Sequence, residues 1–306
     1  MPLRRTLIAG MMALALLPTG CERRPQEPPE RNVFGQQELL IGLMPERNIF
    51  RQRERYQALG SYLSGRLGIT VNFTSLTRYG NIIQRLSEEK LDGAFLGSFT
   101  YALAHSTMGM EAVARPVNVD GTSTYHGYLF ARKDSGIRTV ADMKGKRFAY
   151  VDRATTAGYL FPRAYLKEKG VADPDRYFGE VFFAGSHDAT VLAVLNGEAD
   201  IGASKNTVYD QLARENARVV KELLILAASA VVPQNGLAVR KDLDPELKKA
   251  LKQALLDMDK DRDGLEALRQ LGARGFVETI DKDYAYVYAL AAQVGLNLRA
   301  YRYMNR

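Results

Sequence analysis

Apolar and polar positions follow two alternating periods along the chain from residue 38 onward. Short β-prone runs are each followed by a longer stretch in which apolar residues recur at three- and four-residue spacing. Tyr56, Leu59 and Leu63 share one helical face in the first such stretch, and Gly68 ends it. We expect strands at 38–45, 69–76, 91–98 and 110–117, with helices at 51–68, 80–90 and 101–109 between them.

The same order of elements begins again near residue 147. We expect strands at 147–152, 181–185, 199–204 and 222–229, with helices at 156–170, 187–198 and 206–216. A chain that alternates strand and helix builds sheets covered by helices. The pattern therefore predicts an α/β protein of two similar lobes, each a mainly parallel sheet flanked by helices.

Two similar segments flank the second block of elements. "YLFARKD" at 128–134 and "GLAVRKD" at 236–242 are both β-prone runs that end in Arg-Lys-Asp. We interpret them as two hinge strands, at which the chain leaves the first lobe and returns to it. Lobe one is then 37–129 with 238–306, including a helical tail, and lobe two is 130–237. A cleft between two such lobes is where the carboxyl ends of the strands meet.

The N-terminal residues have the pattern of an export signal. Arg4 and Arg5 precede an apolar run at 7–17 that is too short to span a bilayer, and Gly20 precedes the single cysteine, Cys21. This resembles a bacterial lipoprotein signal over 1–21, with Cys21 as the lipidated residue. An ordinary secretory signal with a chance cysteine is the alternative. Residues 22–36, rich in Pro and charge, are expected to form a flexible tether.

Composition and charge exclude several classes of function. The 306 residues carry a net charge of +7 without a basic run of the kind that binds nucleic acid. One cysteine permits no intramolecular disulfide, and the three histidines are far apart in sequence. Catalytic, nucleotide-binding and metal-binding motifs are missing. We therefore expect no enzyme activity, no metal and no cofactor.

The starts of several predicted helices carry hydroxyl groups and small residues. Thr155 and Thr156 stand at such a start, ahead of Pro162, which removes an amide from the helix and predicts an irregular first turn. Ser186–His187 and Ser98–Tyr101 stand at two others. Each site taken alone has an alternative: a threonine merely caps its own helix at 155–156, and Ser186 is an N-cap residue beside a surface histidine at 186–187. Because all these starts follow strands, they are expected to meet in one cleft and bind an oxyanion there.

Four segments resemble a known family. They are "RFAYVDRATTAGYLFPRAYLKEKG", "GSHDATVLAVLNGEAD", "STYHGYLFARKDSGI" and "VVPQNGLAVRKDLDPEL". In this order they are similar to the phosphate, phosphite and phosphonate-binding proteins of bacterial ABC transporters, over about residues 38 to 260. That family has the type II periplasmic binding protein fold, so the resemblance implies this fold here.

The resemblance also implies ligand-binding residues. The family's Ser-Thr-Ser stretch matches Thr155, Thr156 and Ala157, which loses one hydroxyl, and its cleft histidine matches His187. Further contacts are implied at Tyr79, Tyr101, Tyr125 and Glu46, and the helix start at Ser98 is a candidate from the sequence pattern. The acidic contact that the family uses for an aminophosphonate has no counterpart here.

These observations lead to one main hypothesis. The resemblance implies an exported, lipid-anchored, monomeric binding protein that captures a phosphorus oxyanion and delivers it to an ABC permease. A lipoprotein that senses the same anion and signals to a membrane receptor or histidine kinase is an alternative of another class. An exported hydrolase is a third.

Overall fold

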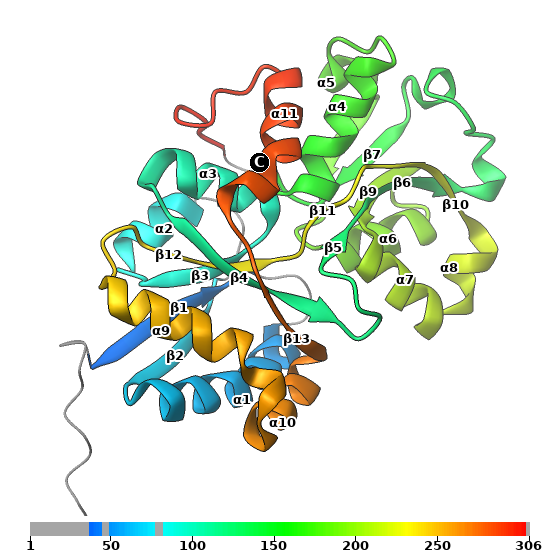
Figure 1. Cartoon of the computed structure of the whole chain (residues 1–306). Helices are drawn as coiled ribbons and strands as arrows, with labels where there is room; N and C mark the ends of the chain where they lie inside the picture. Colours follow the sequence, from blue (N-terminus) through cyan, green and yellow to red (C-terminus); the bar gives the residue numbers. More distant parts are fainter. Residues whose placement is uncertain (1–36, 45–48, 77–81, 304–306) are drawn as a thin grey trace, which may run out of the picture. The chain divides into compact units, whose positions relative to one another are not determined.

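A computed structural model of the chain describes residues 37–44, 49–76 and 82–303. This part of the chain forms a six-stranded sheet, a five-stranded sheet and a two-stranded ribbon, with helices against the two larger sheets (Figure 1). The α/β class predicted from the sequence is therefore confirmed. The predicted segments 1–21 and 22–36 lie outside the described residues.

The first sheet has the strand order β13-β4-β12-β3-β1-β2. Its strands are β1 (Glu38–Leu43), β2 (Thr70–Ser75), β3 (Gly93–Leu96), β4 (Glu111–Asn118), β12 (Gly236–Val239) and β13 (Ala273–Glu278). β1 pairs in parallel with β2 and β3, whereas the pairs β12–β3, β12–β4 and β13–β4 are antiparallel. Four of the six strands, β1 to β4, therefore run in one direction, as the predicted mainly parallel sheet requires, and β12 and β13 run against them.

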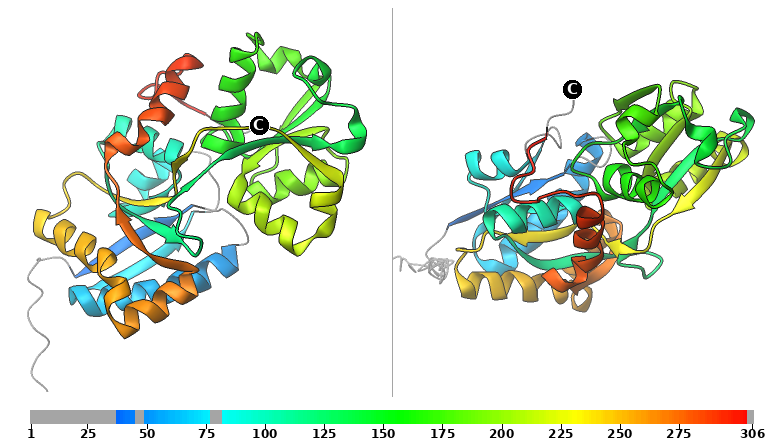
Figure 2. Two further views of the ribbon diagram at one scale, coloured as in Figure 1. Left: turned by 45° about the vertical axis from the view of Figure 1, so that its right-hand side comes forward. Right: turned by 90° about the horizontal axis from the view of Figure 1, so that it is seen from above.

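The period-two pattern of β1 assigns its side chains to two cores. Leu39, Ile41 and Leu43 pack with the helices on one face, and Leu40 and Met44 join the cluster on the other face. The helices of the first face are α1 (Ile49–Leu67), α9 (Pro245–Leu256) and α10 (Arg262–Leu271) (Figure 2). The opposite face carries α2 (Ile82–Glu88) and α3 (Ser98–Met108).

The second sheet has the strand order β10-β6-β9-β7-β8 and mixes both kinds of pairing. Its strands are β6 (Gly127–Arg132), β7 (Arg147–Tyr150), β8 (Glu180–Phe183), β9 (Ile201–Lys205) and β10 (Leu223–Ala228). Phe130 and Ala149 face a core made with α6 (His187–Leu195), α7 (Asn206–Glu215) and α8 (Ala217–Glu222). The opposite face packs against the π-helical turn η3 (Thr156–Leu160) and α4 (Phe161–Glu168). The short helix α5 (Pro174–Tyr177) follows α4.

The two sheets repeat one arrangement, as the repeated sequence pattern predicts. β2-β1-β3 of the first sheet corresponds to β8-β7-β9 of the second. In both sets an aspartate just before the third strand accepts a hydrogen bond from the middle strand. The Asp92 carboxylate accepts from the Leu40 amide of β1, and the Asp200 carboxylate accepts from the Arg147 amide of β7, each at 2.9 Å. The equivalence shows that the similar sequence order reflects a similar fold in each half.

The chain crosses between the sheets at the ribbon formed by β5 (Thr124–Tyr125) and β11 (Val232–Pro233). The two segments that we expected to be hinge strands lie just after it, and each belongs to one sheet: β6 to the second, β12 to the first. The boundaries expected at 129/130 and 237/238 fall inside these strands. The chain therefore crosses between the sheets a few residues before each of the two boundaries that the similar segments predict.

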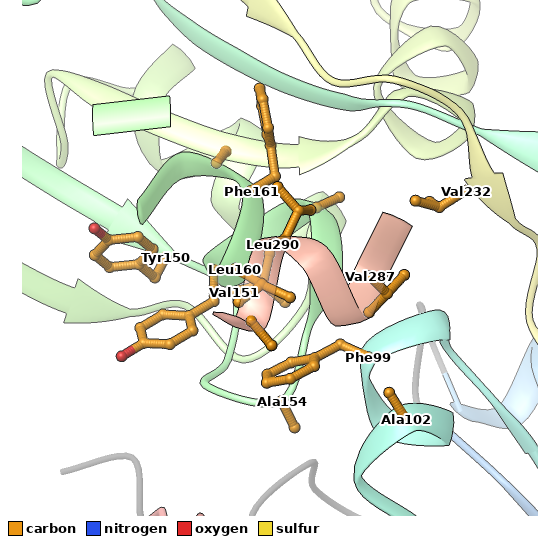
Figure 3. Packing of buried hydrophobic residues seen from close by; sticks show 14 of the residues in the cluster. Phe99, Ala102, Tyr150, Val151, Ala154, Leu160, Phe161, Val232, Val287 and Leu290 are labelled. Atoms are coloured by element: carbon orange, nitrogen blue, oxygen red, sulfur yellow. The ribbon is translucent and has the colours of Figure 1, made fainter. Parts of the chain in front are cut away.

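The C-terminal residues contact both halves of the described chain. After β13 the chain forms a 3₁₀ turn at Asp281–Tyr284 and helix α11 (Ala285–Gln293). α11 packs against α3 of the first half and α4 of the second, and Figure 3 shows Val287 and Leu290 of α11 with Phe99 and Leu160. The prediction that the helical tail belongs to lobe one is therefore incomplete, because α11 also packs against α4 of the second half. Among the described residues, no helix is both long and apolar enough to cross a membrane.

Candidate functional site

The turn after β7 is held by Asp152. Its carboxylate accepts from the Ala154 amide at 2.8 Å, and its carbonyl accepts from the amide and hydroxyl of Thr155 at 3.1 and 2.7 Å. Thr155 is the N-cap residue of the following helix, but its side chain makes no capping hydrogen bond. The capping explanation for Thr155 is therefore wrong, because its hydroxyl stabilises the turn before the helix.

The helix after this turn begins with a π-helical turn, so the irregular start predicted from Pro162 is confirmed. In a regular helix the Gly158 carbonyl would accept from the amide of residue 162, which proline lacks. It accepts instead from the Val151 amide at 3.2 Å. The first intrahelical bond runs from the Leu160 amide to the Thr155 carbonyl. The four amides of residues 156–159 precede that bond, as expected for the donors at a helix start.

Gly158 is required by this packing. A Cβ atom at position 158 would lie 2.4 Å from Cγ2 of Val151 and 2.9 Å from Oγ1 of Thr155. Such distances are far shorter than van der Waals contact, so any side chain would push the turn away from β7. Glycine therefore lets the first turn approach the strand that positions it.

The start of α3 meets this turn directly. The Phe99 amide donates to Oγ1 of Thr156 at 2.8 Å, and the Thr100 hydroxyl donates to the Ala154 carbonyl at 3.0 Å. Ser98, the first residue of α3, is fully buried and donates to the Pro233 carbonyl at 2.6 Å. Two helix N-termini, one from each half of the fold, are thus in hydrogen-bonding contact through buried hydroxyl groups.

This arrangement has the electrostatic properties of an anion site. Each helix N-terminus carries a partial positive charge and amides that lack intrahelical partners. Thr156 Oγ1 accepts a bond from Phe99, and a hydroxyl that accepts one bond still has its proton to donate. Two positive helix ends and a donor hydroxyl at one place favour a bound anion, as predicted from the sequence pattern.

His187 lies at the start of α6, behind its N-cap residue. The Ser186 hydroxyl accepts from the Ala189 amide at 3.3 Å, so capping by Ser186 is confirmed. His187 is buried, and its Nδ1 accepts from the Lys205 amide at 3.1 Å. Because an amide can only donate, Nδ1 carries no proton, and the proton of the neutral ring is on Nε2. The ring therefore presents a donor through Nε2.

Two residues that were not predicted from the sequence, Lys205 and Asn235, lie beside Tyr125 in this region. Its hydroxyl lies 3.4 Å from Ser98 Oγ, and its ring lies under the Lys205 ammonium, with Nζ 4.5 Å from the centroid. Lys205 Nζ also lies 3.4 Å from Oδ1 of Asn235. Lys205 and Asn235 each stand at the junction of a strand with the next segment. Extending the search from helix starts to every strand end would have found Lys205.

Among the described residues, one predicted contact, Tyr101, does not join this group. The Tyr101 hydroxyl donates to Asp281 at 3.1 Å, and burial followed by the charge of Asp281 raises the pKa of Tyr101. Tyr101 thus connects α3 to the C-terminal segment, because its position in the helix turns its ring away from the helix start. Tyr79 and Glu46 lie outside the described residues, as does Cys21. Ala157, by contrast, is buried against Gly127 beside the turn.

Comparison with known proteins identifies related sequences. A family model described as "ABC transporter, phosphonate, periplasmic substrate-binding protein" matches residues 41–284. The phosphate-import protein PhnD of Mycolicibacterium smegmatis is 29% identical over 208 residues, which are 65% of this chain and 64% of that protein. The chain thus spans less than two thirds of that relative. The phosphonates-binding periplasmic protein of Escherichia coli is 27% identical over 231 residues, which are 74% and 68% of the two chains.

A solved structure has the same fold. PhnD1 from Prochlorococcus marinus, determined in complex with methylphosphonate, superposes with a TM-score of 0.74 at 21% sequence identity. The match covers 84% of this chain and 98% of that chain. Arginine-binding proteins of the type II periplasmic binding protein class also match, with a lower TM-score of 0.52. The type II fold implied by the resemblance is therefore confirmed.

Proposed function

Because the chain belongs to the family of periplasmic substrate-binding proteins of phosphonate ABC transporters, we propose that it captures a phosphorus oxyanion between its two halves. The bound anion is phosphate, phosphite or a phosphonate, and it is held where the starts of α3 and η3 meet. The captured ligand is delivered to an ABC permease, and the protein itself, a monomer, catalyses no reaction.

The observation that carries this proposal is the hydrogen bond from the Phe99 amide to Oγ1 of Thr156. It places the positive ends of two helices at one point, and each helix comes from a different half of the fold. An anion at this point gains favourable electrostatic energy from both ends. Its binding therefore also favours the arrangement in which the two halves are in contact.

The residues around this point have complementary roles in the proposal. Thr155, Thr156 and the Ala157 amide contact one face of a tetrahedral oxyanion, and His187 donates from Nε2. Ser98 and Tyr125 complete the opposite side, from α3 and the ribbon. Two relatives support the ligand class: one is named for phosphate import, and another was determined with methylphosphonate.

A direct binding screen tests the proposed function. Isothermal titration and thermal unfolding should be recorded with phosphate, phosphite, methylphosphonate and sulfate. A ligand at 100 times its Kd should stabilise the folded protein by about 2.7 kcal/mol. Binding of at least one phosphorus oxyanion in preference to sulfate is expected. If none of the three binds, the proposed function is wrong.

We further propose that the protein is exported and is held on the membrane by a lipid on Cys21. The charged start, the apolar run and Gly20 before this single cysteine support the proposal. Cys21→Ala should move the protein from the membrane fraction to the soluble fraction, as detected by fractionation and immunoblot. A variant that stays in the membrane fraction without detergent would rule out the anchor.

A further inference from the structure

The segment that follows β13 runs from the first half of the fold to the second. It leaves the first sheet at β13, and Tyr301 near its end contacts the turn that precedes η3. We propose that residues 281–303 form a strap that holds the two halves together, and that Tyr301 of this strap is a positioning residue of the anion site. This inference rests on the proposed function, since it concerns how tightly that site retains its phosphorus oxyanion.

Asp281 fixes the beginning of the strap to the first half. Its Oδ1 accepts from the hydroxyl of Tyr101 on α3 at 3.1 Å and from the hydroxyl of Tyr288 on α11 at 2.6 Å. His105 Nε2, also on α3, lies 3.7 Å from the same oxygen. The rings of Tyr101 and Tyr284 lie against each other, with their centroids 4.1 Å apart. One carboxylate therefore binds the start of α11 to α3.

Helix α11 then contacts the second half. The side-chain amide of Gln293 donates to the Ala164 carbonyl of α4 at 3.1 Å. Val287 and Leu290 belong to the same buried cluster as Leu160 of η3 (Figure 3). Because α11 packs on elements of both halves, the strap is a second connection between them besides the ribbon β5–β11.

Tyr301 lies beside the point where the two helix starts of the proposed site meet. Its hydroxyl donates to the Arg153 carbonyl at 3.1 Å, and its ring centroid lies 5.8 Å from that of Phe99. Phe99 is the residue whose amide donates to Oγ1 of Thr156. Tyr301 thus contacts the turn of the second half and the helix start of the first half at the same time. It acts on the anion through these two elements.

The turn before η3 is held from three directions. The Arg153 carbonyl accepts from Tyr301 of the strap, and the Ala154 carbonyl accepts from the Thr100 hydroxyl of the first half. The Arg153 guanidinium lies over the ring of Phe183, at the end of β8, with Cζ 4.7 Å from the centroid. The strap is therefore one of three supports that fix the backbone just before the proposed anion-binding amides.

The strap has a predictable effect on ligand affinity. Opening the two halves about the ribbon breaks the contact of Tyr301 with either Phe99 or Arg153, so both contacts together favour the closed arrangement. The apparent Kd equals the intrinsic Kd divided by the fraction of protein in the binding-competent state. A hydrogen bond and an aromatic contact together change that equilibrium by about ten- to a hundredfold.

Three variants separate this effect from simple packing. Tyr301→Ala removes the hydroxyl and the ring, whereas Tyr301→Phe keeps the ring. Arg302→Ala is the matched control, because Arg302 is the exposed next residue and donates to the Arg299 carbonyl within the strap. The radius of gyration without ligand should be measured by small-angle X-ray scattering. Titration calorimetry should give the Kd for inorganic phosphate and for methylphosphonate, and urea unfolding the stability.

Tyr301→Ala should have a larger radius of gyration than the wild type without ligand, and the same radius at ligand saturation. Its Kd should rise by about tenfold or more. Tyr301→Phe should raise the Kd less, by about two- to fivefold, because it loses the hydrogen bond alone. Arg302→Ala should match the wild type. A side chain that served packing alone would lower the urea midpoint without changing the ligand-free radius or the Kd.

Several results would overturn the inference. An unchanged ligand-free radius or an unchanged Kd in Tyr301→Ala would do so, as would an equal effect of Arg302→Ala. If Tyr301→Ala does not fold, Gln293→Ala, which breaks the bond between α11 and α4, provides the same comparison. If the wild type and Tyr301→Ala bind phosphate or methylphosphonate equally, only the strap is wrong. If the wild type binds no phosphorus oxyanion, the proposed function itself fails, and the ligand-free radius still decides on the strap.

Discussion

Thr156 is the residue that joins the two helix starts. Its Oγ1 accepts from the Phe99 amide across the two halves of the fold, and its side chain is buried with a relative exposure of 4%. The hydroxyl proton remains available for a ligand oxygen. A capping role at its own helix start would require the side chain to bind an amide of the same helix. The observed partner is instead an amide of α3.

We predict that Thr156→Val weakens oxyanion binding by about ten- to a hundredfold, because a hydrogen bond to a charged group contributes about 1.5 to 3 kcal/mol. Valine keeps the shape of the side chain and removes only the hydroxyl. Titration calorimetry with the ligand found in the screen measures the effect. Thr156→Ser, which keeps the hydroxyl, is the matched control and should bind nearly as well as the wild type.

Chemical unfolding of the same variants separates binding from folding. Loss of the Phe99–Thr156 bond should lower the free energy of unfolding by about 1 kcal/mol in the absence of ligand. A Thr156→Val protein that unfolds more easily but binds with the wild-type Kd would contradict the anion-site assignment of this turn. Its hydroxyl would then have a structural role alone.

At the scale of elements, each sheet depends on an aspartate that connects two neighbouring strands. Asp200, just before β9, accepts from the Arg147 amide, and its carboxylate pairs with the Arg147 guanidinium at 2.9 Å. Burial by itself would raise the pKa of Asp200, but the hydrogen bonds from Arg147 outweigh burial and hold this pKa below its usual value of 3.8. The charged form of Asp200 therefore stabilises the junction of β7 and β9.

We predict that this contribution depends on pH. A carboxyl whose pKa is lower in the folded state stabilises the fold at neutral pH, and the stabilisation is lost as the pH falls through the folded-state pKa. Asp200→Asn should lower the free energy of unfolding by about 1 kcal/mol at neutral pH, a small value because the pair is partly exposed. The difference from the wild type should shrink as the pH is lowered below 3.8.

Urea unfolding over a pH series measures this difference. Asp259→Asn, which alters an exposed carboxylate between α9 and α10, is the matched control and should change stability little at any pH. A constant difference between Asp200→Asn and the wild type down to about pH 2 would show that the charge of Asp200 does not contribute as argued.

At the scale of the whole described chain, the ribbon β5–β11 is where the two halves are connected. The ribbon pairs only two residues from each strand, whereas the strands that follow it are embedded in the large sheets. Few backbone hydrogen bonds therefore have to change when the halves move about this point, which is typical of a hinge. Ser98 contacts this ribbon through the Pro233 carbonyl, so the hinge and the proposed site are adjacent.

We predict that ligand binding closes the two halves about this ribbon. Small-angle X-ray scattering should show a smaller radius of gyration with saturating ligand than without it, because the anion stabilises the arrangement in which both helix starts are in contact. Sulfate at the same ionic strength is the control and should cause little change. An unchanged radius of gyration at ligand saturation would argue against hinge closure.

The sequence by itself determined the class of fold, the repeated order of elements and the family. These depend on local patterns, which can be recognised without knowledge of long-range contacts. Such patterns are the spacing of Tyr56, Leu59 and Leu63, the period of β1 and the segments that resemble the family. The irregular helix start was predictable for the same reason, since Pro162 lacks an amide whatever surrounds it. The family prediction is confirmed by the match over residues 41–284.

Only the tertiary structure decided how the strands pair and which side chains meet. The antiparallel pairing of β12 with β3 joins residues at least 140 positions apart, for which the local sequence carries no signal. Tyr101 and Lys205 show the same limit at the site: the tyrosine binds Asp281, and the lysine lies on the Tyr125 ring. A side chain's direction depends on the rotation of its helix or strand against distant elements. Local patterns indicate where polar groups cluster, but long-range packing selects the ones that face the ligand.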